Sequence, residues 1–315
     1  MTVNLKNPIY QDEAKAREHL ESLRWPDGAY CPRCGGFQVV KLGGKAGDLG
    51  QYNCRDCRKK FTVTVGTIFE RSHIPLTTWL LAFQLMTSSK KGMSAHQLHR
   101  MLDVTYKTAW FMAHRIRESM RPTDVRSGPK GGEGKIIEAD ETYIGGKEKN
   151  KHKSKRRHPT GGAGGKQAAF ALVERGGHVR SFHVAKISGK DLRPYIVTQV
   201  SRKSTLMTDE GGQYRHVGKE FARHETVNHS IDEYVRGDAH TNTVEGYFSI
   251  LKRGVTGVYH HVSEAHLKRY LCEFDFRYNE RAALGVSDDE RCAKAIQGSS
   301  GKRLTYRRPD GAAHA

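Results

Sequence analysis

The sequence predicts an α/β protein in which two small N-terminal modules precede a larger domain of strands and helices. Three observations support this prediction. Two Cys-x-x-Cys pairs lie near the N-terminus, residues 77–120 have the hydrophobic period of helices, and strands followed by alternating strands and helices begin at residue 136. Strands that alternate with helices are typical of an α/β domain with its own core.

The composition of the chain indicates a protein that binds a polyanion. Its 315 residues include 53 Lys and Arg against 34 Asp and Glu, so the formal net charge is +19 and the pI is near 9.7. Nucleic acid is the commonest partner of so basic a protein, and anionic lipid or no polyanion at all are the alternatives. The N-terminus lacks the apolar core of a signal peptide, and the longest apolar stretch, residues 76–89, is too short to span a bilayer. We therefore expect a cytoplasmic, nucleoid-associated protein without a membrane partner.

A zinc ribbon is predicted over residues 28–66, after an N-terminal helical segment at residues 1–27. Four cysteines occur as CPRC and CRDC with 19 residues between the pairs. Each pair can form a knuckle that offers two thiolates, and two knuckles complete a tetrahedral site, whereas four buried thiols without a metal would not need the duplicated spacing. A disulfide framework is not expected in a reducing cytoplasm. One structural Zn²⁺ is therefore expected at Cys31, Cys34, Cys54 and Cys57.

Residues 67–121 are predicted to form a helix-turn-helix DNA-binding region. One helix is expected at 77–86, and residues 93–120 predict a helix, a short turn at Asp103-Val104 and a second, basic helix. Any small helical hairpin would share this pattern, so DNA binding is favoured mainly by the adjoining zinc ribbon. N-caps are expected at Ser94 and Thr105.

The two faces of the predicted helix pair differ in chemistry. Apolar residues at helical spacing predict an inward face of Leu98, Leu102, Ala109, Met112 and Ile116. Basic residues of the second helix are expected to point outward and to contact DNA: Lys107, His114, Arg115 and Arg117.

The α/β domain is expected over residues 136–282, after a linker at residues 122–135 that is rich in Gly, Pro and charge. Its first strand is an apolar run that begins at Ile136 and is expected to end at Asp140. Further strands are predicted at 167–177, 178–186 and 204–210, and helices at 191–200, 241–254 and 264–282. Residues 283–315 are polar and basic, and a partly disordered tail is expected there.

Three acids in this domain predict a site for divalent cations. Asp140 and Asp209 each end a predicted strand, and Glu245 lies in an amphipathic helix with 35 residues between it and Asp209. Carboxylates suit Mg²⁺ or Mn²⁺, and two such ions about 4 Å apart can activate an attacking oxygen and stabilise the leaving oxygen of a phosphodiester. Each acid alone could be an ordinary solvated residue. Acidic residues at the strand ends of a basic, DNA-binding domain would repel phosphate, however, unless cations lie between the carboxylates and the phosphate. Strand alternation puts Glu138 on the same side as Asp140.

The helix that carries Glu245 offers further candidates on the same face. Asn242 lies one turn before Glu245, and Lys252 lies two turns after it. Lys252 is expected to hold a phosphate beside the metal site, although a basic residue near a helix C-terminus is also favoured by the helix dipole alone. Arg253 is expected to contact DNA. The opposite face, with Val244, Phe248 and Leu251, is expected to be buried.

A basic run at residues 145–158 follows the Asp140 strand. It contains seven Lys or Arg and one Glu, which is typical of a flexible segment that contacts an anion, and a solvated insertion is the alternative. Contacts to the DNA backbone are expected from Lys147, Lys149, Lys151, Lys153, Lys155, Arg156 and Arg157.

The acidic motifs resemble those of bacterial insertion-sequence transposases of the DDE superfamily. The resemblance is carried by Asp140 in EADETYIGG, Asp209 in LMTDEGGQY and Glu245 in HTNTVEGYFSILKRG. A Cys₄ ribbon followed by a helix-turn-helix is similar to the zinc-ribbon branch related to Merlin elements, which has an ISXO2-like transposase domain. The resemblance covers roughly residues 20–282. It implies a ribonuclease-H-like catalytic domain in which the three acids bind two Mg²⁺ or Mn²⁺ ions, and because some members of the branch use asparagine as the third ligand, Asn242 is the alternative to Glu245.

The resemblance also implies a reaction and partners. A DNA transposase would bind the terminal inverted repeats of its element, cleave there, and join the 3′-hydroxyl to target DNA by two-metal-ion phosphoryl transfer. Synapsis of two ends implies a homo-oligomer, at least a dimer. A DNA-binding regulator with an inert second domain and a nuclease that cuts without joining are the alternatives. A tyrosine recombinase based on Tyr143 is disfavoured because the sequence lacks an evident Arg/His constellation.

Overall fold

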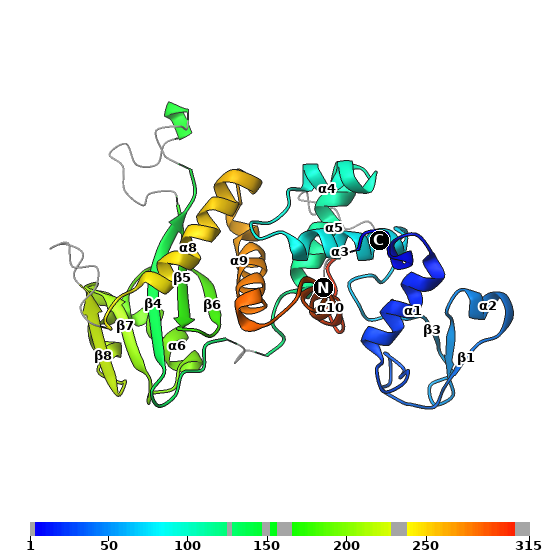
Figure 1. The fold of residues 1–315 in the computed structure, drawn as a ribbon, viewed down its shortest axis with the longest axis horizontal. Coiled ribbons are helices and arrows are strands. Elements are labelled where there is room, and N and C mark those ends of the chain that lie inside the picture. The colour runs from blue at the N-terminus through cyan, green and yellow to red at the C-terminus, as the bar shows by residue number, and fades with distance from the viewer. Residues whose placement is uncertain (1–3, 125–127, 147–151, 156–165, 228–237, 306–315) are drawn as a thin grey trace. The chain divides into compact units, whose positions relative to one another are not determined.

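The computed structural model describes residues 4–124, 128–146, 152–155, 166–227 and 238–305. Contacts divide the chain into two compact units (Figure 1). One unit is Met1–Arg121 with Val286–Ala315, and the other is Pro122–Gly285. No helix in the described part of the chain is both long and apolar enough to cross a membrane.

The first unit begins with a short turn of helix, a longer helix and a small antiparallel sheet. Asp12 caps the longer helix by accepting hydrogen bonds from the N–H groups of Ala14 and Lys15. The sheet has the strand order β1-β2-β3, and Cys54 in β2 lies opposite Val39 in β1. The bounds are η1 Pro8–Tyr10, α1 Glu13–Arg24, β1 Val39–Lys41, α2 Gly44–Asp48, β2 Tyr52–Cys54 and β3 Lys60–Phe61.

The predicted helices follow, as α3 Leu76–Ser88, α4 Ala95–Leu102 and α5 Tyr106–Ser119. The caps are where the sequence predicts them, because the hydroxyls of Ser94 and Thr105 accept hydrogen bonds from backbone N–H groups of α4 and α5. Asp103 ends α4 in the left-handed conformation, with φ of 49°. All five residues predicted for the inward face are buried.

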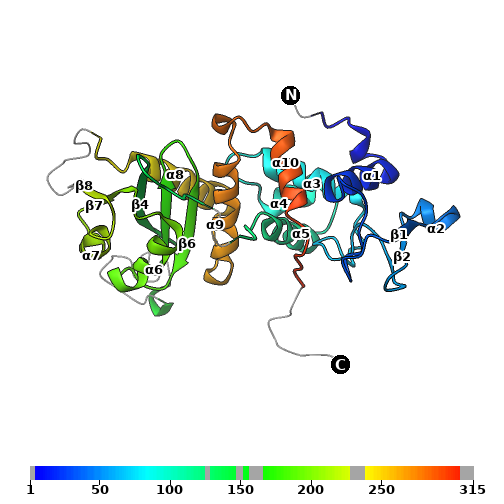
Figure 2. The same cartoon turned by 90° about the horizontal axis from the view of Figure 1, so that it is seen from below.

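The segment after residue 285 differs from the disordered tail that was predicted. It contains α10, Asp288–Gln297, which packs against α3, α1 and α5 of the first unit (Figure 2). A capping box between Ser287 and Glu290 starts this helix. Its apolar face is narrow, with Cys292, Ala295 and Ile296 buried, so the polar composition of the segment concealed a packed helix.

Part of the predicted linker belongs to the second unit. The N–H of Gly132 donates to Ser204 Oγ at 2.9 Å, and the carbonyl of Lys130 accepts from the N–H of Ser201 at 2.9 Å. The boundary between the units falls between Arg121 and Pro122. The segment before β4 is therefore hydrogen-bonded to the second unit and is not a flexible linker.

The second unit contains a mixed five-stranded sheet with the order β6-β5-β4-β7-β8. The central β4 pairs antiparallel with β5 and parallel with β7, and β8 runs parallel to β7. The strands are β4 Ile136–Ile144, β5 Gln167–Glu174, β6 Val179–Val184, β7 Thr205–Asp209 and β8 Arg223–Val227. The helices are α6 Gly189–Gln199, α7 Arg215–Gly218, α8 Asn242–Gly254 and α9 Glu264–Asn279. Short helical turns are η3 Lys153–Lys155, η4 Gly212–Tyr214, η6 Val255–Tyr259 and η7 Ala282–Leu284.

The sheet separates two apolar cores, because neighbouring side chains of a strand point to opposite faces. Ala169 and Ala171 of β5 pack with α8 and α9, whereas Phe170 and Leu172 pack with α6 and η4. Figure 2 shows α8 and α9 on one side of the sheet and α6 and α7 on the other. On β4, Ile144 belongs to the α8 core, while Ile137 and Ala139 belong to the α6 core. Glu138 and Asp140 therefore face α8, and Glu141 faces the α6 side.

Candidate functional site

The four cysteines predicted to bind zinc meet in the first unit. Their sulfurs all lie within 4.8 Å of one another, and Cys31–Cys57 and Cys34–Cys54 are each 3.6 Å apart. A tetrahedral ion with Zn–S bonds of about 2.3 Å holds its sulfurs about 3.8 Å apart, so the group fits one structural Zn²⁺. Burial opposes ionisation of Cys31, but N–H groups of its knuckle and the neighbouring thiols lower its pKa to about 7. Gly35 turns the first knuckle at φ of 78°, a conformation that favours glycine.

Asp140 lies in the middle of β4, and the prediction that it ends the strand is wrong. β4 continues to Ile144 because β5 pairs with it from Ile137 to Ile144, with Asp140 opposite Ala171. The neighbouring β7 pairs with β4 only as far as Glu138, which lies opposite Met207. In that parallel register Asp140 comes level with Asp209, the last residue of β7. The two carboxylates therefore leave the same face of the sheet at the point where β7 ends.

Asp209 is held in a tight turn. Its Oδ1 accepts a hydrogen bond from the N–H of Gly211 at 3.0 Å. A Cβ at Gly211 would lie 2.8 Å from that oxygen and 2.3 Å from the side-chain nitrogen of Gln213, so any other residue would have to displace these side chains. Gly211 thus leaves room for the turn that holds Asp209.

Glu245 lies in the first turns of α8, where its side chain is exposed. Its Oε1 accepts a hydrogen bond from the hydroxyl of Thr241 at 2.7 Å. Asn242, the alternative third ligand, is the first residue of α8 and is also exposed. Val244, Phe248 and Leu251 are buried, as the amphipathic pattern predicted.

Lys252 and Arg253 are exposed in the last turn of α8. The guanidinium of Arg253 donates to the carbonyl and hydroxyl oxygens of Ser249, at 3.2 and 2.9 Å. Both residues lie near the helix C-terminus, where the dipole favours a cation. Both are therefore accessible to a polyanion, and their role in binding one stays a prediction.

The acids of the second unit interact through their charges. Burial, together with the charges of Glu141, Asp209 and Glu245, raises the pKa of Asp140 to about 7 against the opposing effect of the hydrogen bond from the Glu141 N–H. Burial also raises the pKa of Glu141, with a contribution from the charge of Asp209. Carboxylates that repel one another in a partly buried position form a site that a cation would stabilise.

The acid group is more open than the cysteine group. Within the described residues, the cysteines are the group of three or more metal-ligand side chains whose ligand atoms all lie within 4.8 Å. Two ions about 4 Å apart need ligands spread over a wider space than one ion does, so this openness is compatible with a two-metal site. The chemistry of the set also fits Mg²⁺ or Mn²⁺, because all three candidate ligands are carboxylates.

Two glutamates beside the acids, Glu138 and Glu141, have contacts that the sequence did not predict. Glu138 is fully buried and accepts hydrogen bonds from Arg175 and from the start of α8. Glu141 accepts hydrogen bonds from Gln213 and Tyr214 on the opposite face of β4. Strand alternation predicted that Glu138 lies on the same face as Asp140. The hydrogen-bond partners of both glutamates could not be predicted, because they lie in distant segments of the chain.

Three of the four basic residues expected on the outer face of the second helix are in fact buried. Exposed fractions are 1% for His114, 8% for Arg115 and 2% for Arg117. The guanidinium of Arg115 donates to the backbone carbonyls of Ile68 and Leu304, at 2.7 and 3.2 Å. Leu304 belongs to the C-terminal segment, which folds back over α5 and could not be placed from the helix pattern. Of the four, Lys107 in the first turn of α5 is exposed.

Most of the basic run at 145–158 lies outside the described residues. This applies to Lys147, Lys149, Lys151, Arg156 and Arg157. Lys153 is exposed, and Lys153–Lys155 form the short helical turn η3. The expected DNA contacts of this run stay a prediction.

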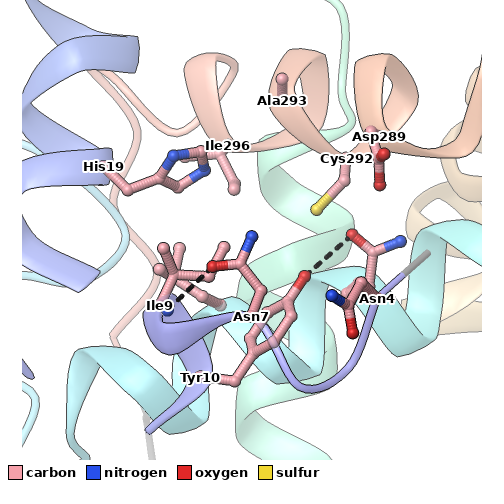
Figure 3. A pocket seen from close by; sticks show the side chains of 11 residues that line it. Asn4, Asn7, Ile9, Tyr10, His19, Asp289, Cys292, Ala293 and Ile296 are labelled. Atoms are coloured by element: carbon pink, nitrogen blue, oxygen red, sulfur yellow. Dashed lines mark hydrogen bonds between the residues drawn. The ribbon is translucent and has the colours of Figure 1, made fainter. Parts of the chain in front are cut away.

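A separate cavity of about 380 Å³ lies in the first unit, between η1, α1, α3 and α10 (Figure 3). Tyr10, His19 and Cys292 line it, and the Tyr10 hydroxyl donates to Gln84 Oε1 at 3.2 Å. Burial raises the pKa of Cys292 to about 12, so its thiol is neutral at physiological pH. A neutral thiol and a hydrogen-bonded phenol are weak nucleophiles.

Family models match parts of both units. Residues 131–279 match the family model described as ISXO2-like transposase domain, and residues 11–60 match the Transposase zinc-ribbon domain. A protein of Halobacterium salinarum described as "Uncharacterized protein in transposable element ISH50" is 30% identical over 279 residues. The alignment covers 85% of this chain and 91% of that relative.

Proposed function

The chain belongs to the family of ISXO2-like transposases with an N-terminal zinc ribbon, and from that premise we propose that it is a DDE transposase. It binds the ends of an insertion sequence, cleaves there and joins the 3′-hydroxyl to target DNA. The observation that carries the proposal is the register of β4 and β7, which brings Asp140 level with Asp209 on the face that α8 covers.

In the proposed site, Asp140, Asp209 and Glu245 hold two divalent ions. When bound, the ions lower the pKa of the attacking water or hydroxyl and stabilise the leaving oxygen of the phosphodiester. The carboxylates would hold the ions, so the protein would contribute position and charge instead of a covalent intermediate. Lys252, two turns along α8 from Glu245, contacts a phosphate of the bound end.

Glu245 is the better candidate for the third ligand than Asn242. Its negative charge contributes to the raised pKa of Asp140, which supports a position near the other acids. A carboxylate also binds Mg²⁺ more strongly than an amide oxygen, because it carries a full charge.

The architecture of the second unit supports assignment to a ribonuclease-H-like fold. Numbered along the chain, the five strands lie in the order 3-2-1-4-5, and the second strand is antiparallel to its neighbours. Strands 1 and 4 of this order are β4 and β7, which carry two of the three acids. The helix pair α4 and α5 supports a helix-turn-helix role. Lys107, which is exposed in the first turn of α5, is the residue of this pair that we propose to contact DNA.

DNA is the proposed partner of both units. The net charge of +19 supports binding to phosphate along the terminal inverted repeats and the target. Because two ends must be joined in one event, we propose that the active form is at least a dimer.

Cleavage and strand-transfer assays with DNA that carries the element ends test the proposal. Asp140→Asn and Asp209→Asn should abolish cleavage and leave end binding intact, whereas Glu133→Gln, an exposed carboxylate in the same unit, should retain activity. Cleavage by both Asp variants at the wild-type rate would refute the DDE assignment. Pre-cut ends distinguish a transposase from a nuclease, because a nuclease would yield no joined product.

A further inference from the structure

We propose that Glu138 and Glu141, which flank Asp140 on β4, are positioning residues that set the places of the other two acids. Glu138 fixes the start of α8, which carries Glu245, and Glu141 fixes the turn that follows Asp209. This inference rests on the proposed function, because it concerns the geometry of the same metal site.

The carboxylate of Glu138 caps α8 from the neighbouring sheet. Its Oε2 accepts the N–H of Val244 at 2.9 Å, and its Oε1 accepts the hydroxyl of Thr243 at 2.9 Å. The first N–H groups of a helix have no hydrogen-bond partner within the helix, and the side chain of the N-cap residue usually accepts from one of them. In α8 the side chain of the N-cap residue, Thr241, makes no such hydrogen bond. Thr241 donates its hydroxyl to Glu245 instead. A charged acceptor from β4 therefore replaces the local cap and also interacts favourably with the helix dipole.

Arg175 completes the anchor. Its Nε donates to Glu138 Oε1 at 2.6 Å, and its other nitrogens donate to the carbonyls of Asp238 and His240, each at 2.8 Å. Glu138 is fully buried, whereas the Arg175 side chain is 19% exposed and joins the buried carboxylate to the surface. The approach of the chain to α8 and the first turn of α8 are thus tied to one carboxylate, which lies two residues from Asp140 on the same face.

Glu141 performs the corresponding task on the opposite face of β4. It accepts a hydrogen bond from the side-chain amide of Gln213 at 2.8 Å and another from the hydroxyl of Tyr214. Both donors belong to η4, which begins three residues after Asp209, and Tyr214 is fully buried in the α6 core. The turn that holds Asp209 through the Gly211 N–H is therefore fixed to the strand that carries Asp140.

Together the two glutamates fix the positions of Asp209 and Glu245 relative to β4, the strand that carries Asp140. A metal site requires its ligands to be held to within a fraction of an ångström, and outer partners that orient ligands typically change metal affinity by about 10- to 100-fold. A purely structural role would instead lower the stability of the unit and leave the affinity of the folded protein for metal unchanged.

Binding of Mn²⁺ to the full-length, zinc-loaded protein without DNA, followed by electron paramagnetic resonance, separates these roles. We expect Asp140→Asn to remove the acid-dependent Mn²⁺ site. Glu138→Gln and Glu141→Gln should each weaken that site by roughly tenfold or more. The matched control is Glu273→Gln, because Glu273 is also fully buried and paired with an arginine, Arg277, but lies on α9. Its variant should bind Mn²⁺ within twofold of wild type.

Milder variants cover the case in which a glutamine variant fails to fold. Thr243→Val and Tyr214→Phe each remove one hydroxyl donor to a glutamate and leave the buried charges in place. A lost hydrogen bond of ordinary strength corresponds to a roughly two- to tenfold weaker Mn²⁺ site. Wild-type affinity in these two variants, or in folded Glu138→Gln and Glu141→Gln, would overturn the positioning role alone. Equal Mn²⁺ binding by wild type and Asp140→Asn would overturn the proposed metal site and the positioning role with it.

Discussion

Replacement of Asp140 by asparagine should stabilise the metal-free protein although it removes a proposed metal ligand. Burial and the charges of Glu141, Asp209 and Glu245 raise the pKa of Asp140 from 3.8 to about 7. One pKa unit corresponds to about 1.4 kcal/mol, so ionisation of this carboxylate costs the folded state up to about 4 kcal/mol. Because the side chain keeps some contact with water, which screens part of the repulsion, we expect a gain of about 2 to 3 kcal/mol at pH 8.

The same shift determines the pH dependence. In the folded state Asp140 keeps its proton up to about pH 7, whereas the unfolded chain releases it near pH 3.8. Between these values Asp140 binds more protons in the folded state than in the unfolded chain, so its contribution to the free energy of unfolding falls as the pH rises from about 4 to about 7. The difference between Asp140→Asn and wild type should therefore be small near pH 4 and reach its full size above pH 7.

Urea titrations in Mg²⁺-free buffer measure this difference, with hydrogen exchange of residues 136–144 as the probe. All three tryptophans, Trp25, Trp79 and Trp110, belong to the first unit, so fluorescence would report on the wrong part of the chain. A chelator must be avoided because it would remove the structural zinc. Added Mg²⁺ should stabilise the wild type by mass action and leave the variant unchanged.

Glu133→Gln is the control for this experiment, because an exposed carboxylate should change the unfolding free energy by less than about 0.5 kcal/mol. The reasoning would be refuted if Asp140→Asn were no more stable than wild type at pH 8. A stability gain that is equally large at pH 4 would refute the electrostatic origin and point to packing instead.

Four further outcomes are expected. Glu245→Gln should lower end cleavage at least 100-fold while Asn242→Ala lowers it less than tenfold, and the reverse order in a cleavage assay would make Asn242 the third ligand. Zinc removal, or Cys54→Ser, should abolish hydrogen-exchange protection in residues 28–66 and leave β4 protected; protection that persists in the ribbon would argue against a structural metal. Lys107→Ala should weaken DNA binding and reduce the slope of log K against log salt by about 1, as measured by fluorescence anisotropy. Arg115→Ala should instead destabilise the first unit by about 2 to 4 kcal/mol in urea titrations, because two buried carbonyls lose their donor; a DNA-binding defect without loss of stability would contradict its structural role.

Features that depend on neighbouring residues could be predicted from the sequence. The cysteine spacing predicted a group that the structure brings within 4.8 Å. Ser94 and Thr105 were recognised as caps because a cap interacts with N–H groups two or three residues away. The amphipathic pattern around Glu245 correctly indicated which face of α8 is buried.

Features that depend on distant segments were predicted poorly. The pattern of α5 marked Arg115 as an outward residue, but a carbonyl at Leu304, 189 positions away, binds it. The segment after residue 285 looked like a tail because its apolar face is too narrow to stand out from its polar residues. In each case the residue or helix contacts a segment far away in the sequence, and the local hydrophobic pattern does not identify that segment.

The acid site shows the same contrast between local sequence and long-range contacts. By itself the sequence determined which carboxylates are candidates, since Asp140, Asp209 and Glu245 stand in recognisable motifs, and it determined that Glu138 shares a face with Asp140. Only the tertiary structure decided how they meet: β4 runs on past Asp140 because β5 pairs with it, while β7 stops level with it. Strand pairing and the Glu138 cap on α8 join segments about 70 to 105 residues apart, and such contacts are selected by packing of the whole unit and not by local sequence.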